Sequence, residues 1–266
     1  MARAAGMGLV LVRNCNHFGW GPAYALEHLD DSLLIGNTTQ GAIPIVTPIG
    51  GSTATVGSNA IAIAISTAGA EAAPLFLWDS GTAAMSWGEV QKRRLESASL
   101  RPGCAVDASG QPTTDAGEAA CLLPGGSIGN ALGLLVELLG ASVGAGDPRV
   151  RSAPPDAVPE GEPSTCVFCF FAVDLSRFDG LSFPHGRSRQ QNVAAMADAI
   201  FGGNGSARMV GLRKWQAKQR SVEHGGLLFA AESITAFEAE ALARGIPLPD
   251  MRQVEVTFEE LAVAAK

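Results

Sequence analysis

Five short polar segments of this chain contain residue types that could hold a small ligand. They lie at residues 14–19, 38–41, 57–60, 79–82 and 125–129, and each combines hydroxyl, amide or charged side chains with glycine or another small residue. The first four follow apolar stretches, and the fifth precedes an apolar helical pattern. Turns at strand and helix ends present backbone N–H groups to anionic or amide-bearing ligands. Taken singly, each segment is more typical of an ordinary turn than of a ligand site.

The elements expected to position these segments alternate between strands and helices. Apolar runs predict strands at residues 8–12, 33–38, 60–65, 75–78 and 166–173, and helical patterns occur at 23–29, 86–95, 131–139, 188–201 and 233–244. This alternation favours the α/β class. The proline-rich stretch 149–164 predicts a surface loop or linker. We therefore expect residues 1–150 to form a core that binds cofactor and substrate, and residues 151–266 to be the C-terminal part of the same fold.

Charge and hydropathy argue against several classes of partner. The formal net charge is −7, and the longest basic cluster is Lys92-Arg93-Arg94, so nucleic-acid binding has no support. The apolar segment 57–68 is too short to span a bilayer as a helix, and no secretory signal is recognised. Five cysteines without a disulfide pattern are typical of a reducing compartment. The expectation is a cytoplasmic protein that binds a small molecule, with no nucleic-acid or membrane partner.

Cys166 and Cys169 form a C-x-x-C pair, a pattern found in redox sites and zinc sites. No second pair at zinc spacing accompanies them, and their surroundings are apolar. We interpret both as core residues of a strand and expect no metal site. The chain also lacks the G-x-G-x-x-G, P-loop, G-x-S-x-G and H-E-x-x-H signatures.

The order of the polar segments carries a resemblance over almost the whole chain. The motifs are N-C-N-H-F-G at 14–19, G-G at 50–51, G-S-N-A-I at 57–61, D-S-G-T-A at 79–83, D-A-S-G-Q-P-T-T-D at 107–115 and G-G-S-I-G-N-A-L at 125–132. In this order they resemble the type-2 malate/L-lactate dehydrogenase family, from about residue 2 to 247. The resemblance implies an α/β, non-Rossmann, mixed-sheet fold, usually in a homodimer. It also implies NADPH or NADH as cofactor, and a 2-keto acid, 2-hydroxy acid or cyclic imine 2-carboxylate as substrate.

The resemblance also implies roles for individual residues. His17 would lie near substrate and nicotinamide and orient a carbonyl or carboxylate, although a cap or loop hydrogen bond is an equal alternative. Asp79 would orient a general acid, or else cap a helix. The expected cofactor-binding residues are Thr39, Gly57, Ser58, Asn59, Thr82, Gly126, Ser127 and Gly129. We expect the turns at His17, Asn59, Asp79 and Gly126 to converge on one cleft.

Several positions depart from the family pattern. The helical N-terminal segment with its S-H-G motif is not found, Ile128 replaces a lysine, Gln40 an asparagine and Ala60 a proline. One interpretation is a working reductase whose missing segment comes from a partner, in a homodimer or in a complex with another protein. The alternative is a redox-silent descendant that catalyses another reaction or serves as a partner subunit.

Overall fold

The computed structural model describes residues 1–15, 17, 19–28, 32–41, 43–65, 76–142, 166–203, 207–229, 231–249 and 251. The expected linker at 149–164 therefore lies outside the described residues. The chain divides into two compact units, Met1–Met209 and Val210–Lys266. The expected boundary near residue 150 differs from this division, because the strand at residues 166–174 joins the sheet of the first unit.

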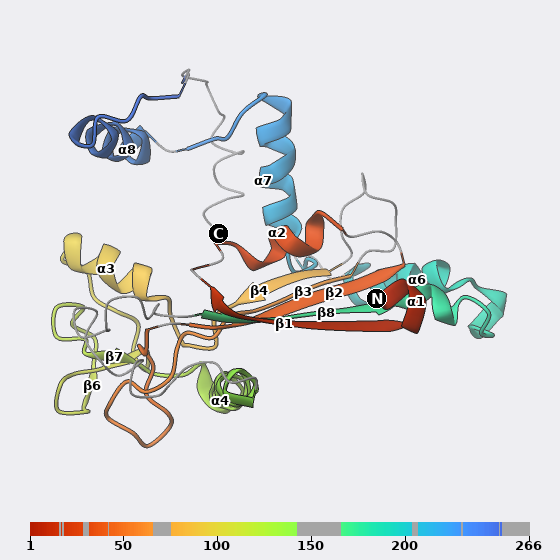
Figure 1. The fold of residues 1–266 in the computed structure, drawn as a ribbon, viewed down its shortest axis with the longest axis horizontal. Helices are drawn as coiled ribbons and strands as arrows, with labels where there is room; N and C mark the ends of the chain where they lie inside the picture. The colour runs from red at the N-terminus through yellow and green to blue at the C-terminus, as the bar shows by residue number, and fades with distance from the viewer. Residues whose placement is uncertain are drawn as a thin grey trace. The chain divides into compact units, whose positions relative to one another are not determined.

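The first unit contains eight strands and five α-helices among its described residues (Figure 1). The strands are β1 (Met7–Cys15), β2 (Leu33–Gln40), β3 (Ile61–Ile65), β4 (Phe76–Ser80), β5 (Ala105–Val106), β6 (Pro112–Thr113), β7 (Cys121–Leu122) and β8 (Cys166–Asp174). The helices are α1 (Ala2–Ala5), α2 (Gly21–Leu26), α3 (Trp87–Leu95), α4 (Gly126–Ser142) and α6 (Arg189–Phe201), with 3-10 turns η2 (Leu175–Phe178) and η3 (Pro184–Gly186).

A five-stranded sheet of order β1-β8-β2-β3-β4 forms the centre of this unit. Every pairing within it is antiparallel. A doubly wound Rossmann sheet requires mostly parallel strands, so the expected non-Rossmann α/β fold is confirmed. The mixture of parallel and antiparallel strands that the resemblance implied is not seen between these named strands.

Two helices lie on opposite faces of the sheet, α2 on one and α4 on the other (Figure 1). Side chains alternate between the faces of a strand. In β2, Asn37 bonds to the backbone of α2, whereas Gln40 bonds to Glu137 of α4. Positions 37 and 39 of β2 therefore face α2, and positions 38 and 40 face α4.

Ala25 of α2 packs on Ala64 and Leu77 of the sheet, and all three are almost fully buried. A larger apolar core lies in a separate lobe that contains α3 and the short sheet β6-β5-β7. Its buried residues are Val46, Val56, Met85, Val90, Leu100, Cys104, Ala105, Ala116, Ala119 and Leu122. The loop at 57–60 connects this lobe to β3 of the main sheet, and the loop at 81–83 connects β4 back to the lobe.

The second unit contains α7 (Leu212–Glu223) and α8 (Ala231–Ala243) among its described residues. The sequence pattern predicted α8, but it did not predict α7, which has no buried residue. The predicted strands and the remaining predicted helices are found, with ends shifted by a few residues. No helix within the described ranges is long and apolar enough to cross a membrane.

Asp174 fastens the N-terminal helix to the end of β8. Its Oδ1 accepts hydrogen bonds from the Ser176 hydroxyl at 2.6 Å and from Arg3 Nη1 at 2.8 Å, and the residue is 3% exposed. The Ser176 hydroxyl is the main cause that lowers the pKa of Asp174 below its ordinary value, and Arg3 adds to it. The charged carboxylate therefore stabilises the folded chain.

Asp174→Asn is expected to lower the Tm at neutral pH and to lower it by a smaller amount at acidic pH. A carboxylate whose pKa is lower in the folded state stabilises the fold fully at pH values above the ordinary pKa of aspartate. This stabilisation is lost as the pH falls through the lower pKa of the folded state. Thermal melts of wild type and variant across the acidic range measure this. Asp198→Asn, on the exposed side of α6, is the matched control and should leave the Tm unchanged. Equal Tm losses at all pH values would contradict the assignment.

Candidate functional site

Two polar groups of residues gather at one end of the main sheet, one on each face. The first, which we call the α2 group, consists of Trp20, Asn37, Thr39 and Asp79. Asp79 Oδ2 accepts a hydrogen bond from Trp20 Nε1 at 3.0 Å, and Asn37 Nδ2 donates to the Gly21 carbonyl at 2.9 Å. Both bonds hold the start of α2 on the sheet. In the register, Ala62 pairs with both Asp79 and Asn37, so these two side chains lie on either side of a small residue.

The α2 group includes polar atoms that the described chain leaves without a hydrogen-bond partner. Asn37 Oδ1 and Thr39 Oγ1 are such atoms, in residues that are 2% and 5% exposed. The two side chains are two positions apart in β2 and therefore share a face. A buried polar atom without a partner costs about 1–3 kcal/mol, so a bound ligand or water that supplies one would be favoured here.

His17 lies in an exposed turn between β1 and α2. Its Nδ1 accepts a hydrogen bond from the Gly19 backbone N–H at 3.0 Å, which is the loop hydrogen bond considered as an alternative role. An imidazole whose Nδ1 is an acceptor carries its proton on Nε2 when neutral. The Trp20 bond to Asp79 connects this turn to the sheet. The turn therefore uses Nδ1 of His17 and fixes Nε2 as the nitrogen that carries the proton of the neutral ring.

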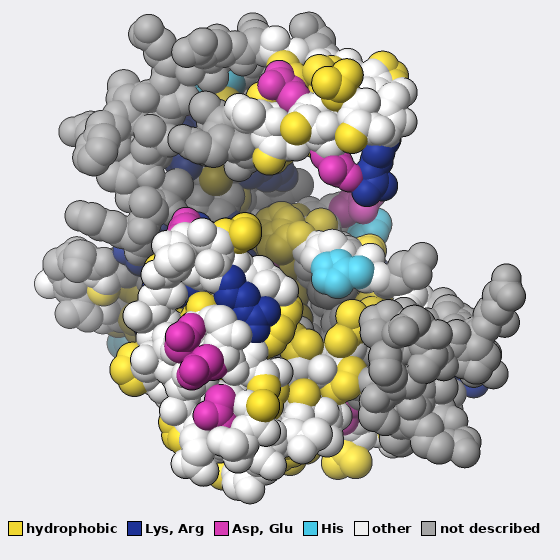
Figure 2. Space-filling view, turned by 90° about the vertical axis from the view of Figure 1, so that its left-hand side faces the viewer, with side chains coloured by type: hydrophobic (Ala, Val, Ile, Leu, Met, Phe, Trp, Pro, Cys, Tyr) yellow, Lys and Arg dark blue, Asp and Glu magenta, His cyan; other side chains and the backbone are white. Residues whose placement is uncertain are grey.

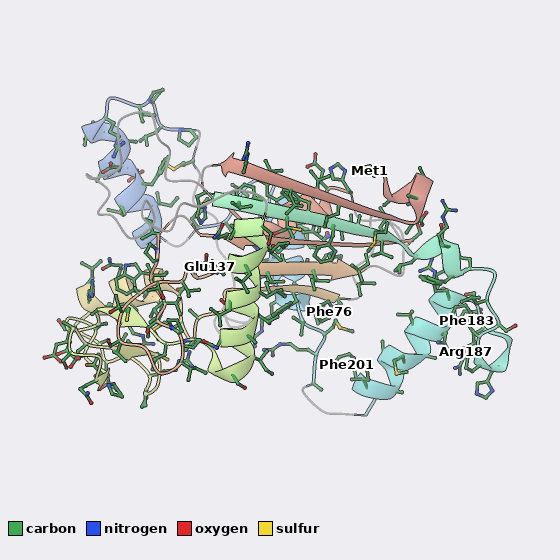
Figure 3. The ribbon with its side chains drawn as sticks, turned by 60° about the horizontal axis from the view of Figure 1, so that its bottom comes forward. Met1, Phe76, Glu137, Phe183, Arg187 and Phe201 are labelled. Carbon is green, nitrogen blue, oxygen red and sulfur yellow. The ribbon has the colours of Figure 1, made fainter. Side chains whose placement is uncertain are left out.

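The second group, which we call the α4 junction, consists of Gln40, Gly57, Asn59 and Glu137. Glu137 Oε1 accepts from the Gly57 backbone N–H at 2.8 Å and from Asn59 Nδ2 at 3.0 Å. Its Oε2 accepts from Gln40 Nε2 at 2.6 Å. Glu137 is in the C-terminal half of α4 (Figure 3). One carboxylate thus ties together a helix, a strand end and the loop before β3.

Asn59 has a structural environment with little room for a ligand. It is fully buried, and its φ of 39° lies in the left-handed region that asparagine tolerates better than most residues. Besides the bond to Glu137, Nδ2 donates to the Gly133 carbonyl at 2.9 Å, and Oδ1 accepts from the Gly41 N–H at 3.1 Å. Both amide hydrogens and the carbonyl oxygen are engaged within the protein.

Glycines on α4 allow the helix to approach the loop after β4. A Cβ at Gly129 would lie inside van der Waals contact of the Thr82 carbonyl oxygen, and a Cβ at Gly133 would lie 2.9 Å from Thr82 Oγ1. The Thr82 hydroxyl itself donates to the Ser58 carbonyl at 3.1 Å and is buried. The segments at 57–60, 79–82 and 125–129 are therefore in direct contact.

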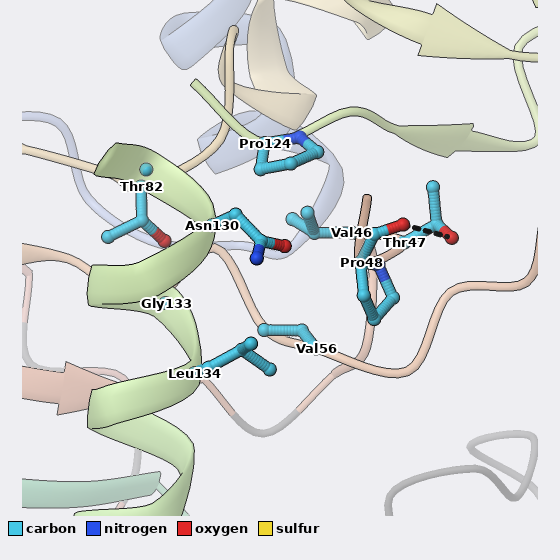
Figure 4. A pocket seen from close by; sticks show the side chains of 10 residues that line it. Val46, Thr47, Pro48, Val56, Thr82, Pro124, Asn130, Gly133 and Leu134 are labelled. Atoms are coloured by element: carbon cyan, nitrogen blue, oxygen red, sulfur yellow. Dashed lines mark hydrogen bonds between the residues drawn. The ribbon is translucent and has the colours of Figure 1, made fainter. Parts of the chain in front are cut away.

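A small, shallow pocket, partly open to solvent, lies where α4 meets the α3 lobe (Figure 4). Its walls are mostly apolar or small residues: Val46, Pro48, Val56, Pro124, Gly129, Gly133 and Leu134, with Thr47, Thr82 and Asn130 as the polar ones. Asn130 Oδ1 accepts from the Ile49 N–H at 3.0 Å. At the start of α4, Gly126 and Ser127 are exposed.

The structure joins most, but not all, of the residues that the sequence singled out. One set of these residues is joined by hydrogen bonds and close packing around α4: Gly57, Ser58, Asn59, Thr82 and Gly129. Thr39 and Asp79 face α2 on the other side of the sheet, with His17 in the turn beside them. The expected single cleft is thus two groups on opposite faces. Within the described ranges, no three His, Cys, Asp or Glu side chains cluster as a metal site would require.

Three residues of these groups were not expected from the sequence: Trp20, Asn37 and Glu137. Glu137 had a detectable signal, because it is the only charged residue in α4. A single carboxylate in an otherwise uncharged helix indicates a buried polar contact. Asn37 and Trp20 gave no comparable signal, because their roles depend on how α2 packs on the sheet.

Comparisons with known proteins agree with this fold. A family model described as malate/L-lactate dehydrogenase matches residues 1–236. L-sulfolactate dehydrogenase from Methanocaldococcus jannaschii is 36% identical over 147 residues, which is 54% of this chain and 41% of that relative. Delta(1)-pyrroline-2-carboxylate reductase from Pseudomonas fluorescens is 31% identical over 232 residues, 84% of this chain and 65% of that relative. The chain thus spans less than two thirds of either relative's length.

A solved structure of sulfolactate dehydrogenase from Methanocaldococcus jannaschii superposes with a TM-score of 0.71. The match covers 92% of this chain and 69% of that one, at 26% identity. Because the family model covers most of the sequence and the superposition covers most of the fold, the chain belongs to the malate/L-lactate dehydrogenase family.

Proposed function

We propose that this chain is an NAD(P)H-dependent oxidoreductase that acts on a 2-keto acid, a 2-hydroxy acid or a cyclic imine 2-carboxylate. Family membership supports an enzyme of the dehydrogenase and reductase type. The relatives described above act, by their names, on sulfolactate and on pyrroline-2-carboxylate. Such names give no support to the redox-silent alternative. The observation that carries the proposal is the α2 group, with its two buried polar atoms beside the His17 turn.

The α2 group fits an amide-bearing ligand such as a nicotinamide. Asn37 Oδ1 can accept a hydrogen bond, and Thr39 Oγ1 can donate or accept one. A carboxamide carries both kinds of group, so it would satisfy both atoms at a depth where water is largely excluded. When bound, the nicotinamide would supply the hydride. His17, through Nε2, would donate a hydrogen bond to the substrate oxygen or nitrogen, and Asp79 would hold the turn by way of Trp20.

In this proposal the dinucleotide passes around the end of the sheet, from the α2 group on one face to the start of α4 on the other, and its phosphates bind mainly to backbone N–H groups. Ser127 lies in the first turn of α4, where the helix dipole favours an anion, and Gly126, whose N–H donates to the Pro124 carbonyl at 2.7 Å, begins the helix. Lys and Arg side chains do not gather into a patch on the face shown in Figure 2, and Ile128 occupies the position of the family's lysine. In this proposal, five residues support the site through contacts within the protein and do not touch the cofactor: Gly57, Ser58, Asn59, Thr82 and Gly129.

The proposal includes an assembly partner, either a second copy of this chain or a separate protein. Ile128, Leu135 and Leu138 of α4 are 73%, 58% and 66% exposed. Contiguous exposed apolar surface of this kind is typical of an interface. The proposal also places the enzyme in the cytoplasm, where its five reduced cysteines and a nicotinamide cofactor are compatible.

The test is a titration of the purified chain with NADPH and with NADH, followed by nicotinamide fluorescence. We expect binding with a Kd of about 0.01–1 mM, because few charges contact the phosphates. Thr39→Val, which removes a hydroxyl proposed to bind the nicotinamide, should weaken cofactor binding at least about tenfold, which corresponds to about 1.4 kcal/mol. His17→Ala should chiefly slow turnover, because His17 is proposed to contact the substrate. His28→Ala, an exposed histidine in the turn after α2, is the matched control. No binding of either cofactor at millimolar concentration would overturn the proposal.

A further inference from the structure

Cys15 and Cys166 lie directly opposite each other on neighbouring strands. Cys15 is the last residue of β1 and Cys166 is the first residue of β8, and the register of the antiparallel pair makes them partners. Neither is part of a disulfide in this structure. Cys15 is partly exposed, and Cys166 is 4% exposed. The two residues are far apart in sequence, so only the sheet brings them together.

Opposite residues in an antiparallel pair have the geometry that a disulfide requires. Their Cα atoms are about 4.5–5.5 Å apart, and their Cβ atoms point to the same face. Disulfides form at Cα separations of about 4.4–6.8 Å. The Cys15 thiol now points to the Arg13 carbonyl, 3.6 Å away. Rotation about χ1 of Cys15 would turn its Sγ away from this carbonyl.

The C-x-x-C neighbour of Cys166 is not a competing partner. Cys166 and Cys169 are three positions apart in a regular strand, so they point to opposite faces and their Cα atoms are roughly 10 Å apart. Cys169 pairs with Leu11 and Thr38, neither of which is a cysteine, and burial raises the pKa of its thiol. Cys104 and Cys121 are buried in the α3 lobe.

A bulge beside the pair links it to the His17 turn. The register of β1 and β8 shifts between Val12 and Cys15, so Arg13 and Asn14 together face Val167. Bulges of this kind bend a strand and are common next to active sites. We propose that Cys15 and Cys166 are an oxidant-responsive thiol pair, which a peroxide converts into a cross-strand disulfide that locks this bulge.

The reaction balances with hydrogen peroxide as the oxidant. The thiolate of Cys15, the more exposed residue, attacks one peroxide oxygen; an S–O bond forms, the O–O bond breaks, and the departing hydroxide is protonated to water. Cys166 Sγ then attacks the sulfur of the sulfenic acid, an S–S bond forms, and the oxygen leaves as a second water. Two thiols lose two electrons in total, and one peroxide is reduced to two waters.

The experiment treats the reduced full-length chain with hydrogen peroxide, then blocks the remaining thiols and maps the cysteines by mass spectrometry. Digestion with chymotrypsin under denaturing conditions separates Cys166 from Cys169, because Phe168 lies between them. We expect the number of free thiols to fall from five to three, with one cross-linked peptide joining Cys15 to Cys166. No cofactor is present in this assay, so its result is independent of the proposed function.

Three variants and a denatured sample complete the test. Cys15→Ser and Cys166→Ser should each abolish the cross-link while their circular dichroism stays like that of wild type, and Cys104→Ser should retain it. If a variant fails to fold, the cysteine map of the wild-type chain still tests the proposal. In guanidinium, the same peroxide treatment should give mixed pairings. The proposal is overturned if Cys15 is converted to sulfinic acid without a cross-link, or if the folded chain pairs Cys15 with another cysteine.

Discussion

Glu137→Ala is expected to lower the free energy of unfolding by about 2–4 kcal/mol, the largest loss among the variants considered. The substitution removes both carboxylate oxygens of the α4 junction. Gln40 Nε2, the Gly57 N–H and Asn59 Nδ2 then lose an acceptor in a region where little water can replace it. Urea denaturation measured at equilibrium gives the difference directly.

Glu137→Gln distinguishes the role of the hydrogen bonds from the role of the charge. A glutamine keeps one oxygen for Gly57 and Asn59 and places an NH₂ group toward Gln40. Rotation of the Gln40 amide by half a turn would bring its Oε1, now without a partner, to accept from that group. We expect a loss of only about 1 kcal/mol. Glu89→Ala, which removes a half-exposed pair with Arg93 on α3, is the control, at about 0.5 kcal/mol. Equal losses for the alanine and glutamine variants at position 137 would refute the junction.

Gly129→Ala is expected to destabilise the chain by about 1–3 kcal/mol, although alanine is the better helix former. The new methyl group would press on the Thr82 carbonyl oxygen, which is backbone and cannot turn aside. That same oxygen accepts a hydrogen bond from the Gly125 N–H at 2.8 Å. The helix must therefore move away from the loop after β4, and the pocket beside Val56 and Gly133 must widen.

A glycine in another helix provides a control of opposite sign. Gly88 in α3 is exposed, and its nearest neighbour to a new Cβ is the Ser86 hydroxyl at 4.0 Å. Gly88→Ala should therefore stabilise the chain by about 0.5 kcal/mol. Thermal melts of both variants measure the change in Tm that each alanine causes. Stabilisation by alanine at both positions would mean that α4 does not approach Thr82 as closely as described.

The strands of the main sheet could be predicted from sequence because their side chains report burial directly. Ile61 to Ile65 alternates isoleucine with alanine, and β8 is apolar up to its last residue, Asp174, as expected for strands covered on both faces. The order of the strands could not be predicted in the same way. Residue pairing across long sequence separations depends on packing, which no local pattern encodes.

The candidate site was predicted only as a set of turns. The polar composition of residues 57–60 and 79–82 correctly indicated segments that meet α4, because glycines and hydroxyl residues permit close backbone approach. Composition did not distinguish residues that bond within the protein from residues that can meet a ligand. The amide of Asn59 looks like a ligand-binding group in sequence, yet its atoms are engaged by Gly41, Gly133 and Glu137.

The central position of β8 has a consequence for how the chain folds as it is made. β8 separates β1 from β2, so these two strands, which are neighbours in sequence, have no direct pairing with each other. Met7 can pair with Val173, and Leu33 with Asp174, only after β8 has been synthesised. A nascent chain on the ribosome therefore carries β1 as an unpaired strand until most of the first unit has emerged. Such high contact order predicts slow folding that is completed after synthesis, and a dependence on chaperones that shield the open edges of β1 and β2 in the meantime.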